Sequence, residues 1–130
     1  MKNSVLPAIN IQFPISELIL SGKKTIETRT YALPEKYIER DLYLIETPGS
    51  NGAFKARAVA VIRFGKSFQY ASKKEFYKDQ KLHCVDQKSK WAWKEKAKWG
   101  WPVLSVTVLD TPLLPTGRRG IVFSNSVRLK

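Results

Sequence analysis

The sequence has few of the residues that build several common kinds of site. Among 130 residues it has one cysteine, one histidine and one methionine. A lone cysteine, Cys84, excludes an internal disulfide, so we expect an intracellular, cytoplasmic protein. His83 and Cys84 do not form a recognisable metal-ligand spacing, and no glycine-rich loop of the P-loop or Rossmann type occurs. We therefore expect no metal and no cofactor.

Long apolar segments are also missing. No apolar run approaches the roughly 20 residues that cross a membrane. Residues 1–7 lack the apolar core of a signal peptide. We therefore expect no membrane partner, although the positive charge leaves an anionic membrane surface as an alternative that no clean basic amphipathic helix supports.

Acidic residues are scarce relative to basic ones. The chain has 11 Asp and Glu against 23 Lys and Arg, a formal net charge of +12. Residues 63–100 alone hold eleven basic and four acidic side chains, a net of +7. A domain this basic attracts polyanions at long range, and the usual intracellular polyanion is nucleic acid. The composition therefore favours RNA or single-stranded nucleic acid as the partner.

Length and apolar content predict one folded domain over residues 1–130, and we favour a monomer. Hydrophobic residues make up 43% of the chain and aromatic residues 12%, which is typical of a globular domain. Alternation predicts strands, the longest at 53–64, and a hairpin at Asn51-Gly52. The predicted elements are strands at 8–13, 41–47, 53–64, 101–109 and 121–123, a strand after Gly22, and helices at 14–20, 72–80 and 90–98. Five or six strands with two or three helices indicate an α+β barrel, and composition alone does not separate it from an OB-fold.

The stretch from Ser21 to Tyr31 concentrates charge where a helix should end and a strand begin. Gly22 is a helix stop, because glycine adopts the left-handed conformation readily. On the strand, Glu27 and Arg29 share a face and are able to form an ion pair. Lys24 reaches the same side only if the strand begins after it or is bulged there. From the residues alone, a solvated surface strand explains this pattern most simply.

The pattern Gly22-x-Lys24-x-x-Glu27-x-Arg29 resembles the signature of the ASCH family, small domains related to PUA-like RNA-binding barrels. The preceding helix, the chain length and a late Trp99–Val103 strand followed by a Pro-x-Gly turn strengthen the resemblance. It implies a PUA-like five- to six-stranded mixed or antiparallel β-barrel with two or three flanking helices. It also implies that the motif forms the lip of a cleft.

The resemblance raises two enzymatic possibilities, with Lys24 and Glu27 as the candidate catalytic residues. Similar enzymes include an amidohydrolase for acetylated cytidine, which uses a lysine and a threonine nucleophile three residues later. Here Lys24 matches the lysine, but Glu27 occupies the threonine position, and a carboxylate does not copy hydroxyl attack. A metal-independent ribonuclease needs a base and a cation, which Glu27 with Lys24 and Arg29 would supply. We favour an orienting role of Glu27 toward Arg29 over a catalytic one.

Binding of RNA or of a modified nucleotide is the interpretation we favour. A base needs an aromatic face and a cationic rim, and stacking contributes about 1–3 kcal/mol per base. The candidate binding residues are Lys23, Lys24, Glu27, Arg29, Tyr31, Trp91, Trp93, Lys94, Lys98, Arg118 and Arg119. Core packing is the alternative role for the tryptophans, and we expect at least two of the four to be buried. A tryptophan face that meets a partner protein is a third possibility.

Overall fold

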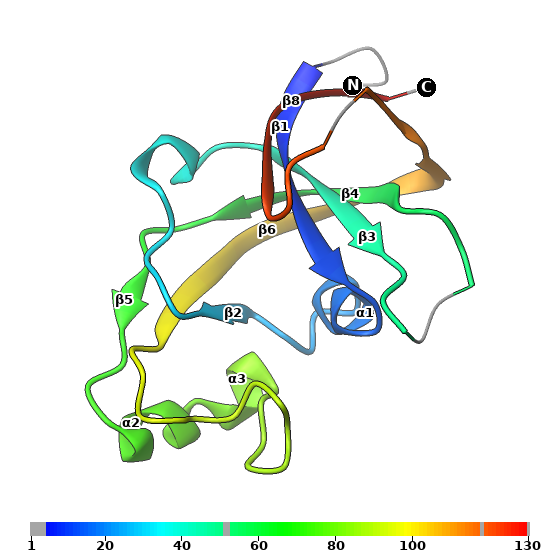
Figure 1. The fold of residues 1–130 in the computed structure, drawn as a ribbon. Coiled ribbons are helices and arrows are strands. Elements are labelled where there is room, and N and C mark those ends of the chain that lie inside the picture. Colours follow the sequence, from blue (N-terminus) through cyan, green and yellow to red (C-terminus); the bar gives the residue numbers. More distant parts are fainter. Residues whose placement is uncertain (1–4, 51–52, 118, 130) are drawn as a thin grey trace.

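The computed structural model describes residues 5–50, 53–117 and 119–129, and Figure 1 shows their arrangement. They form an α+β fold in which one mixed sheet carries three short α-helices and a 3-10 helix. The predicted hairpin at Asn51-Gly52 lies outside the described residues. The strands are β1 Val5–Gln12, β2 Ile26–Arg29, β3 Leu42–Thr47, β4 Arg57–Phe64, β5 Phe68–Gln69, β6 Trp99–Leu113, β7 Pro115–Thr116 and β8 Phe123–Leu129. The helices are α1 Ile15–Leu20, the 3-10 helix η1 Glu35–Tyr37, α2 Lys73–Lys78 and α3 Gln80–His83.

The sheet is open. Its strand order is β2-β6-β4-β3-β1-β8-β7, with β5 paired to β6 outside this path. β1 and β3 are parallel, and the other pairs are antiparallel. Within the described residues the end strands β2 and β7 do not pair with each other, so the structure does not confirm the expected barrel. The predicted five or six strands become eight, because β5 and β7 have two residues each and such short strands leave no alternating pattern.

β6 connects the two halves of the sheet. It has 15 residues and is longer than β4, so the prediction that 53–64 forms the longest strand is wrong. Its first residues pair with β2 and β5, and from Val103 onward it pairs with β4. In this register Glu27 lies opposite Trp101 and Arg29 opposite Trp99. The motif strand is thus held by the tryptophan-rich start of β6.

The main core surrounds Trp101, which is fully buried. The Trp101 ring contacts Phe64 edge-on and stacks on Phe123 at 5.9 Å between ring centroids. Leu42 and Leu44 of β3 join this cluster, whereas Tyr43 and Ile45 pack into a second cluster on the other face of the strand. Such alternation is expected when both faces of a strand are covered. β3 is thus covered on both faces and is buried from Leu42 to Glu46.

The predicted end of α1 and the predicted start of α2 are confirmed, whereas the helix predicted to run to Gln80 ends at Lys78 and is followed by the separate helix α3. Gly22 has a φ of +83°, the left-handed conformation expected after a helix. The Ser72 hydroxyl accepts a hydrogen bond from the Glu75 backbone N–H at 3.1 Å and caps α2. α1 is also fixed to the sheet, because Ser16 donates to the buried Glu46 carboxylate of β3 at 2.6 Å. No helix among the described residues has the length and apolar character needed to cross a membrane.

The predicted helix at 90–98 does not form. Residues 84–98, here called the 84–98 loop, contain turns and bends. The Ser89 hydroxyl accepts from the Trp91 backbone N–H at 3.0 Å, a local turn in place of a helix cap. Glu95 has a φ of +60°, which is incompatible with a right-handed helix. The predicted last strand is wrong as well, since β8 begins only at Phe123 and continues to Leu129.

Candidate functional site

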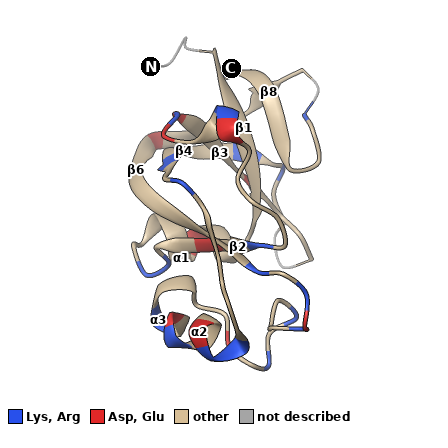
Figure 2. Cartoon of the chain, turned by 90° about the vertical axis from the view of Figure 1, so that its left-hand side faces the viewer, with Lys and Arg blue, Asp and Glu red and all other residues tan. Residues whose placement is uncertain are grey.

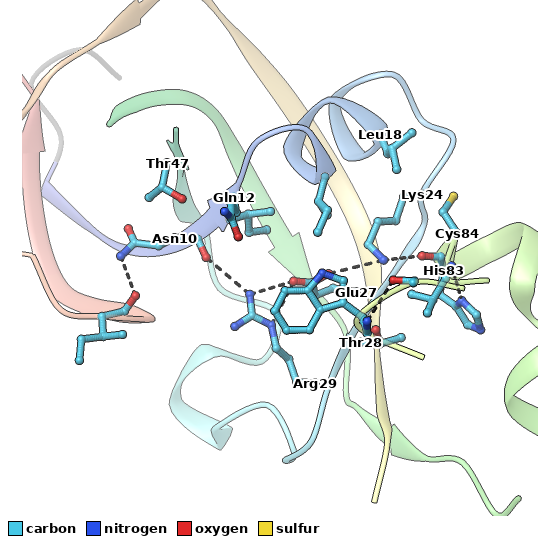
Figure 3. Close-up of a pocket in the computed structure, with 16 residues that line it drawn as sticks. Asn10, Gln12, Leu18, Lys24, Glu27, Thr28, Arg29, Thr47, His83 and Cys84 are labelled. Carbon is cyan, nitrogen blue, oxygen red and sulfur yellow. Dashed lines mark hydrogen bonds and ion pairs between the residues drawn. The ribbon is translucent and has the colours of Figure 1, made fainter. Parts of the chain in front are cut away.

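A cavity of about 440 Å³ lies where the motif meets β1, α1, α3 and the 84–98 loop. Figure 3 shows Lys24, Glu27 and Arg29 on one side of it and Asn10 and Gln12 on another. Its volume is in the range of sites for small molecules, about 300–1,000 Å³. The lining residues are Asn10, Ile11, Gln12, Ile15, Leu18, Lys24, Glu27, Thr28, Arg29, Thr47, His83, Cys84, Val85, Ser89, Trp91 and Ile121.

Lys24 reaches the cavity because β2 begins two residues after it, at Ile26. Its backbone N–H donates to the Leu18 carbonyl at 2.9 Å, which continues the end of α1. Its ammonium group donates to the His83 carbonyl and lies 3.6 Å from Oε1 of Glu27. Only 3% of the side chain is exposed. The condition set by the sequence, a strand that begins after Lys24, is therefore met.

Glu27 and Arg29 form the predicted ion pair. Oε2 of Glu27 accepts from Nε of Arg29 at 3.0 Å and from Nη2 at 2.8 Å. The exposed fraction is 7% for the Glu27 side chain and 19% for Arg29. The guanidinium also lies 5.4 Å from the centre of the Trp101 ring, within the range of a cation–π contact. The pair is therefore part of the cavity wall. This excludes the interpretation of the motif as a solvated surface strand.

Two cations and one carboxylate at this wall leave it with a positive balance when all three are ionised. Burial lowers the pKa of the Lys24 ammonium, and the nearby Glu27 carboxylate opposes this effect. Burial also lowers the pKa of Arg29, but the interactions with Glu27 and Tyr31 outweigh it and the pKa is raised. Arg29 thus stays charged, and Lys24 is the more easily deprotonated of the two. This wall suits an anionic or electron-rich group.

His83 anchors α3 beside the cavity. Its Nε2 lies 2.7 Å from the Phe76 carbonyl, and its Nδ1 accepts from the Val85 backbone N–H at 3.0 Å. A carbonyl only accepts, so Nε2 carries the proton and the ring is neutral. Burial lowers the pKa of His83, and Lys24 and Lys98 act in the same direction. His83 is therefore a core residue with both nitrogens satisfied, and its carbonyl positions Lys24.

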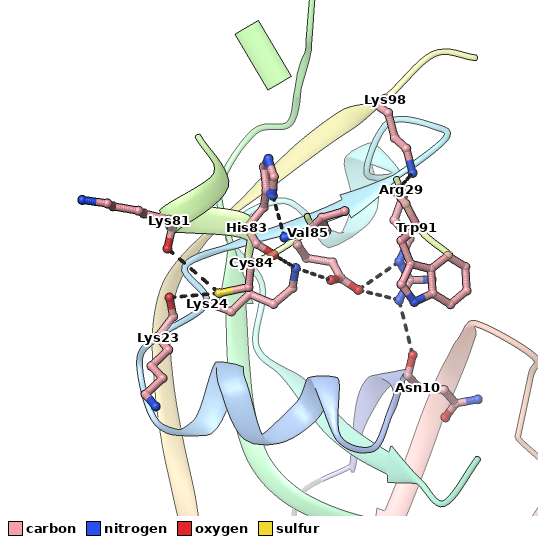
Figure 4. A network of polar contacts seen from close by, with 11 residues as sticks. Asn10, Lys23, Lys24, Arg29, Lys81, His83, Cys84, Val85, Trp91 and Lys98 are labelled. Carbon is pink, nitrogen blue, oxygen red and sulfur yellow. Dashed lines mark hydrogen bonds and ion pairs between the residues drawn. The ribbon is translucent and has the colours of Figure 1, made fainter. Parts of the chain in front are cut away.

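Trp91 supplies the aromatic wall. It is 44% exposed and lines the cavity, and Figure 4 shows its indole beside Arg29. Lys98 is 7% exposed, and its ammonium donates to the Trp91 carbonyl at 2.8 Å. Burial lowers the pKa of Lys98. Lys98, which the sequence predicts as a ligand contact, thus lies behind the loop and fixes Trp91.

The mouth of the cavity is held together by Asn10. Its side-chain amide donates to the carbonyls of Gly120 and Ile121, both at 2.9 Å. Its side-chain oxygen accepts from Nη1 of Arg119 at 3.2 Å. Its backbone carbonyl lies 3.5 Å from Nη2 of Arg29. Asn10 therefore joins β1, the β7–β8 connection and the motif at one point.

The other predicted binding residues lie outside the lining. Lys23 and Lys94 are exposed. Tyr31 is 40% exposed, and its ring packs edge-on against Trp101. Trp93 is half-buried against Phe76. Arg118 lies outside the described residues, and of the four tryptophans only Trp101 is fully buried, fewer than the expected two.

Several lining residues were not predicted. Asn10 and Gln12 are the polar alternates of the first predicted strand, so the period-2 pattern contains them, but it does not tell which outward face meets another element. Thr28, Thr47 and Ser89 carry no distinguishing pattern. Among the described residues, no group of three or more His, Cys, Asp and Glu lies close enough to hold a metal ion.

Comparison with known proteins adds no assignment. No model of a protein family matches the chain, and a search of curated proteins finds no relative. The interpretation of the cavity therefore depends on its own residues.

Proposed function

We propose that the cavity binds RNA or a modified nucleotide, with one base inside it. The observation that carries this proposal is the convergence of Lys24, Glu27 and Arg29 on one cavity that Trp91 also lines, with its indole beside Arg29. A base requires an aromatic face, and its phosphate or carbonyl groups require cations. The overall charge of +12 adds long-range attraction to a polyanion.

The motif supports the same proposal. Gly22, Lys24, Glu27 and Arg29 are the residues that resemble the ASCH signature, and the last three line the cavity. Membership of that family and a PUA-like arrangement of the sheet are part of the proposal. The role proposed for Glu27 is to orient the two cations, because its two oxygens are directed to Lys24 and Arg29.

A pair of arginine variants tests the proposal. We expect Arg29→Ala to weaken binding of single-stranded RNA about 10-fold or more, because a buried charge-assisted contact contributes about 1.5–3 kcal/mol. Arg128→Ala, on the exposed part of β8, removes the same charge away from the cavity and should weaken binding far less. Isothermal titration calorimetry measures both, and thermal unfolding checks that both variants are folded. Equal losses would show diffuse charge attraction and no specific site.

A second candidate function is catalysis in the same cavity. The observation that favours it is the lowered pKa of Lys24 beside the Glu27 carboxylate. In a metal-independent ribonuclease, one of these two groups, in its unprotonated form, takes the proton of the 2′-hydroxyl while that oxygen attacks phosphorus. Arg29 stabilises the charge on the phosphate oxygens, and the other group, in its protonated form, gives its proton to the 5′-oxygen as the bond from that oxygen to phosphorus breaks. A nucleoside amidohydrolase of the acetylated-cytidine type is the other reaction to test.

Incubation with labelled RNA and with acetylated cytidine separates binding from catalysis. Turnover that Lys24→Ala abolishes supports an enzyme. Binding without turnover of either substrate supports a binding module.

A further inference from the structure

A second hollow adjoins the cavity on the side of the helices. It is shallower, with a volume of about 450 Å³, and we call it the α3 hollow. Its lining residues are Tyr77, Lys78, Gln80, Lys81, Cys84 and Asp86. Cys84 lines both the cavity and the α3 hollow. A ligand that continues beyond the cavity past Cys84 therefore enters the α3 hollow.

Two exposed lysines flank this crossing point. The Cys84 sulfur lies 3.5 Å from the Lys23 carbonyl and 4.0 Å from the Lys81 carbonyl. Figure 4 shows the backbone carbonyls of Lys23 and Lys81 near the Cys84 sulfur, while both side chains extend away from it. Neither lysine forms an ion pair with an acidic group in the described part of the chain. Both side chains are exposed, long and flexible, so they have no acidic partner to give up when they turn toward an anion.

The acidic groups nearby do not cancel this charge. Lys78 lies 3.7 Å from Glu75, but both side chains are more than half exposed, and such pairs are weak. Asp86 accepts from the Lys88 backbone N–H at 2.9 Å, which uses one of its oxygens locally. Figure 2 shows both basic and acidic residues around α2 and α3, at the end of the molecule far from β8. The lining of the α3 hollow holds Lys78, Lys81 and Asp86, so its charge balance is positive by one.

A single nucleotide bound in the cavity would not need Lys23 or Lys81. The cavity holds its own cations, Lys24 and Arg29, whereas Lys23 and Lys81 lie outside its lining. Two lysines placed between adjacent hollows match the repeat of a nucleic-acid strand, in which each base is followed by a phosphodiester. The half-buried Tyr77 adds an aromatic surface in the α3 hollow.

We propose that the α3 hollow is the subsite for the next nucleotide of a single strand, and that Lys23 and Lys81 bind the phosphodiester between the two nucleotides. This inference rests on the proposed function and narrows its ligand to a chain with at least one phosphodiester on the α3 side. RNA and DNA share that chemistry.

The test compares two double variants, each of which removes two positive charges. Lys23→Gln/Lys81→Gln removes the proposed contacts. Lys55→Gln/Lys66→Gln removes two exposed lysines that line neither hollow. The probes are homo-hexanucleotides of RNA and of DNA with each of the four bases, and the four nucleoside 5′-monophosphates. Binding is measured by calorimetry between about 0.05 and 0.5 M salt.

We expect the first double variant to lower the magnitude of the slope of log K against log salt by about 0.7, because the two lysines bind one phosphodiester and each single-strand phosphate contributes about 0.7. This difference corresponds to a roughly fourfold loss of hexanucleotide affinity at 0.15 M salt. Affinity for the monophosphates should stay unchanged, and the second double variant should change the slope far less. The RNA and DNA hexamers show which strand is bound.

Three results would overturn the inference. Equal slope changes in the two double variants would indicate diffuse attraction. An unchanged slope in the first variant, or monophosphates that bind as tightly as hexamers, would leave the α3 hollow without a role while the cavity remains a nucleotide site. Failure of the proposed function looks different, because Arg29→Ala would then weaken the binding of both kinds of probe no more than Arg128→Ala does.

Discussion

Lys24, Glu27 and Arg29 are ordinary surface residue types that this structure places in a wall with little exposure. Charges removed from water need partners, and each has one: Glu27 joins the two cations, and the His83 carbonyl accepts from Lys24. These contacts hold both cations in place beside the cavity. For a ligand of the proposed kind, little rearrangement of Lys24 and Arg29 would then be needed.

Alanine substitutions of Trp91 and Trp101 should differ in their effect on the free energy of unfolding. Trp101→Ala is expected to lower the free energy of unfolding by about 3–5 kcal/mol, because the ring is fully buried. Trp91→Ala should lower it by about 1 kcal/mol or less, since the ring is 44% exposed and the carbonyl that holds Lys98 remains. Urea denaturation measures both values.

The same Trp91→Ala variant should lose about 1–3 kcal/mol of RNA binding, the contribution of one stacked base. A Trp91→Ala protein that is strongly destabilised, or that binds RNA like the wild type, would show that Trp91 is a structural residue.

The sequence predicts part of the site at this scale. Glu27 and Arg29 are two residues apart on a strand, so their pairing follows from the pleat alone. The partners of Lys24 do not follow, because His83 is 59 residues away in the chain. Lys98 shows the same limit: its charge suggested a ligand contact, but long-range packing directs it to the Trp91 carbonyl.

At the scale of elements, α3 and the 84–98 loop form one side of the site and are held by hydrogen bonds at several points. The Thr25 backbone N–H donates to the Leu82 carbonyl at 2.8 Å, and the Trp93 N–H donates to the Tyr77 hydroxyl at 3.1 Å. His83 links α2, through the Phe76 carbonyl, to the start of the loop at Val85. The protonation state of His83 therefore affects how the loop is held.

Stability should depend on pH through His83. Burial, Lys24 and Lys98 lower the pKa of His83, whereas the Phe76 carbonyl and Asp79 act to raise it. Asp79 also accepts a hydrogen bond from the Tyr70 hydroxyl at 2.8 Å. The folded-state pKa is below the ordinary value of about 6.5, so the unfolded chain binds the proton more readily. The stability from neutral His83 is complete above about pH 6.5 and is lost as pH falls toward the folded-state pKa.

Urea denaturation between pH 7.5 and 5.5 checks this prediction. His83 is the only histidine of the chain, so it is the one side chain with an ordinary pKa in that window. His83→Gln should be less stable than the wild type at pH 7.5 and should vary less with pH. A wild-type free energy of unfolding that is flat over this range, or equal pH dependence in the variant, would contradict the role given to His83.

Local sequence rules predict the elements that depend on local chemistry. Ser72 and Glu75 mark the start of α2, and Gly22 marks the end of α1, because each acts on neighbouring backbone groups. The 90–98 segment has helical spacing but no helix, since Trp91, Trp93 and Lys98 each pack in a different place. Tertiary contacts override local preference there.

At the scale of the whole molecule, the long strand β6 brings the halves of the chain together. It pairs with β2 at its start and with β4 further on, and so sets the motif against the main core. The α+β class follows from the sequence, whereas closure of the sheet depends on pairings between its end strands, which no local pattern specifies. The charge bias of residues 63–100 is likewise visible in the sequence, but only the fold shows that α3 lies beside the motif.

The most direct test of the central claim follows the indole N–H signals of the four tryptophans by NMR during titration with single-stranded RNA hexamers. The Trp91 signal and the Nε–H signal of Arg29 should shift together and saturate with one strand per protein. Trp101, whose indole donates to the Tyr31 carbonyl at 3.1 Å, should stay in place. Shifts confined to other residues, with Trp91 and Arg29 unchanged at saturation, would contradict the account.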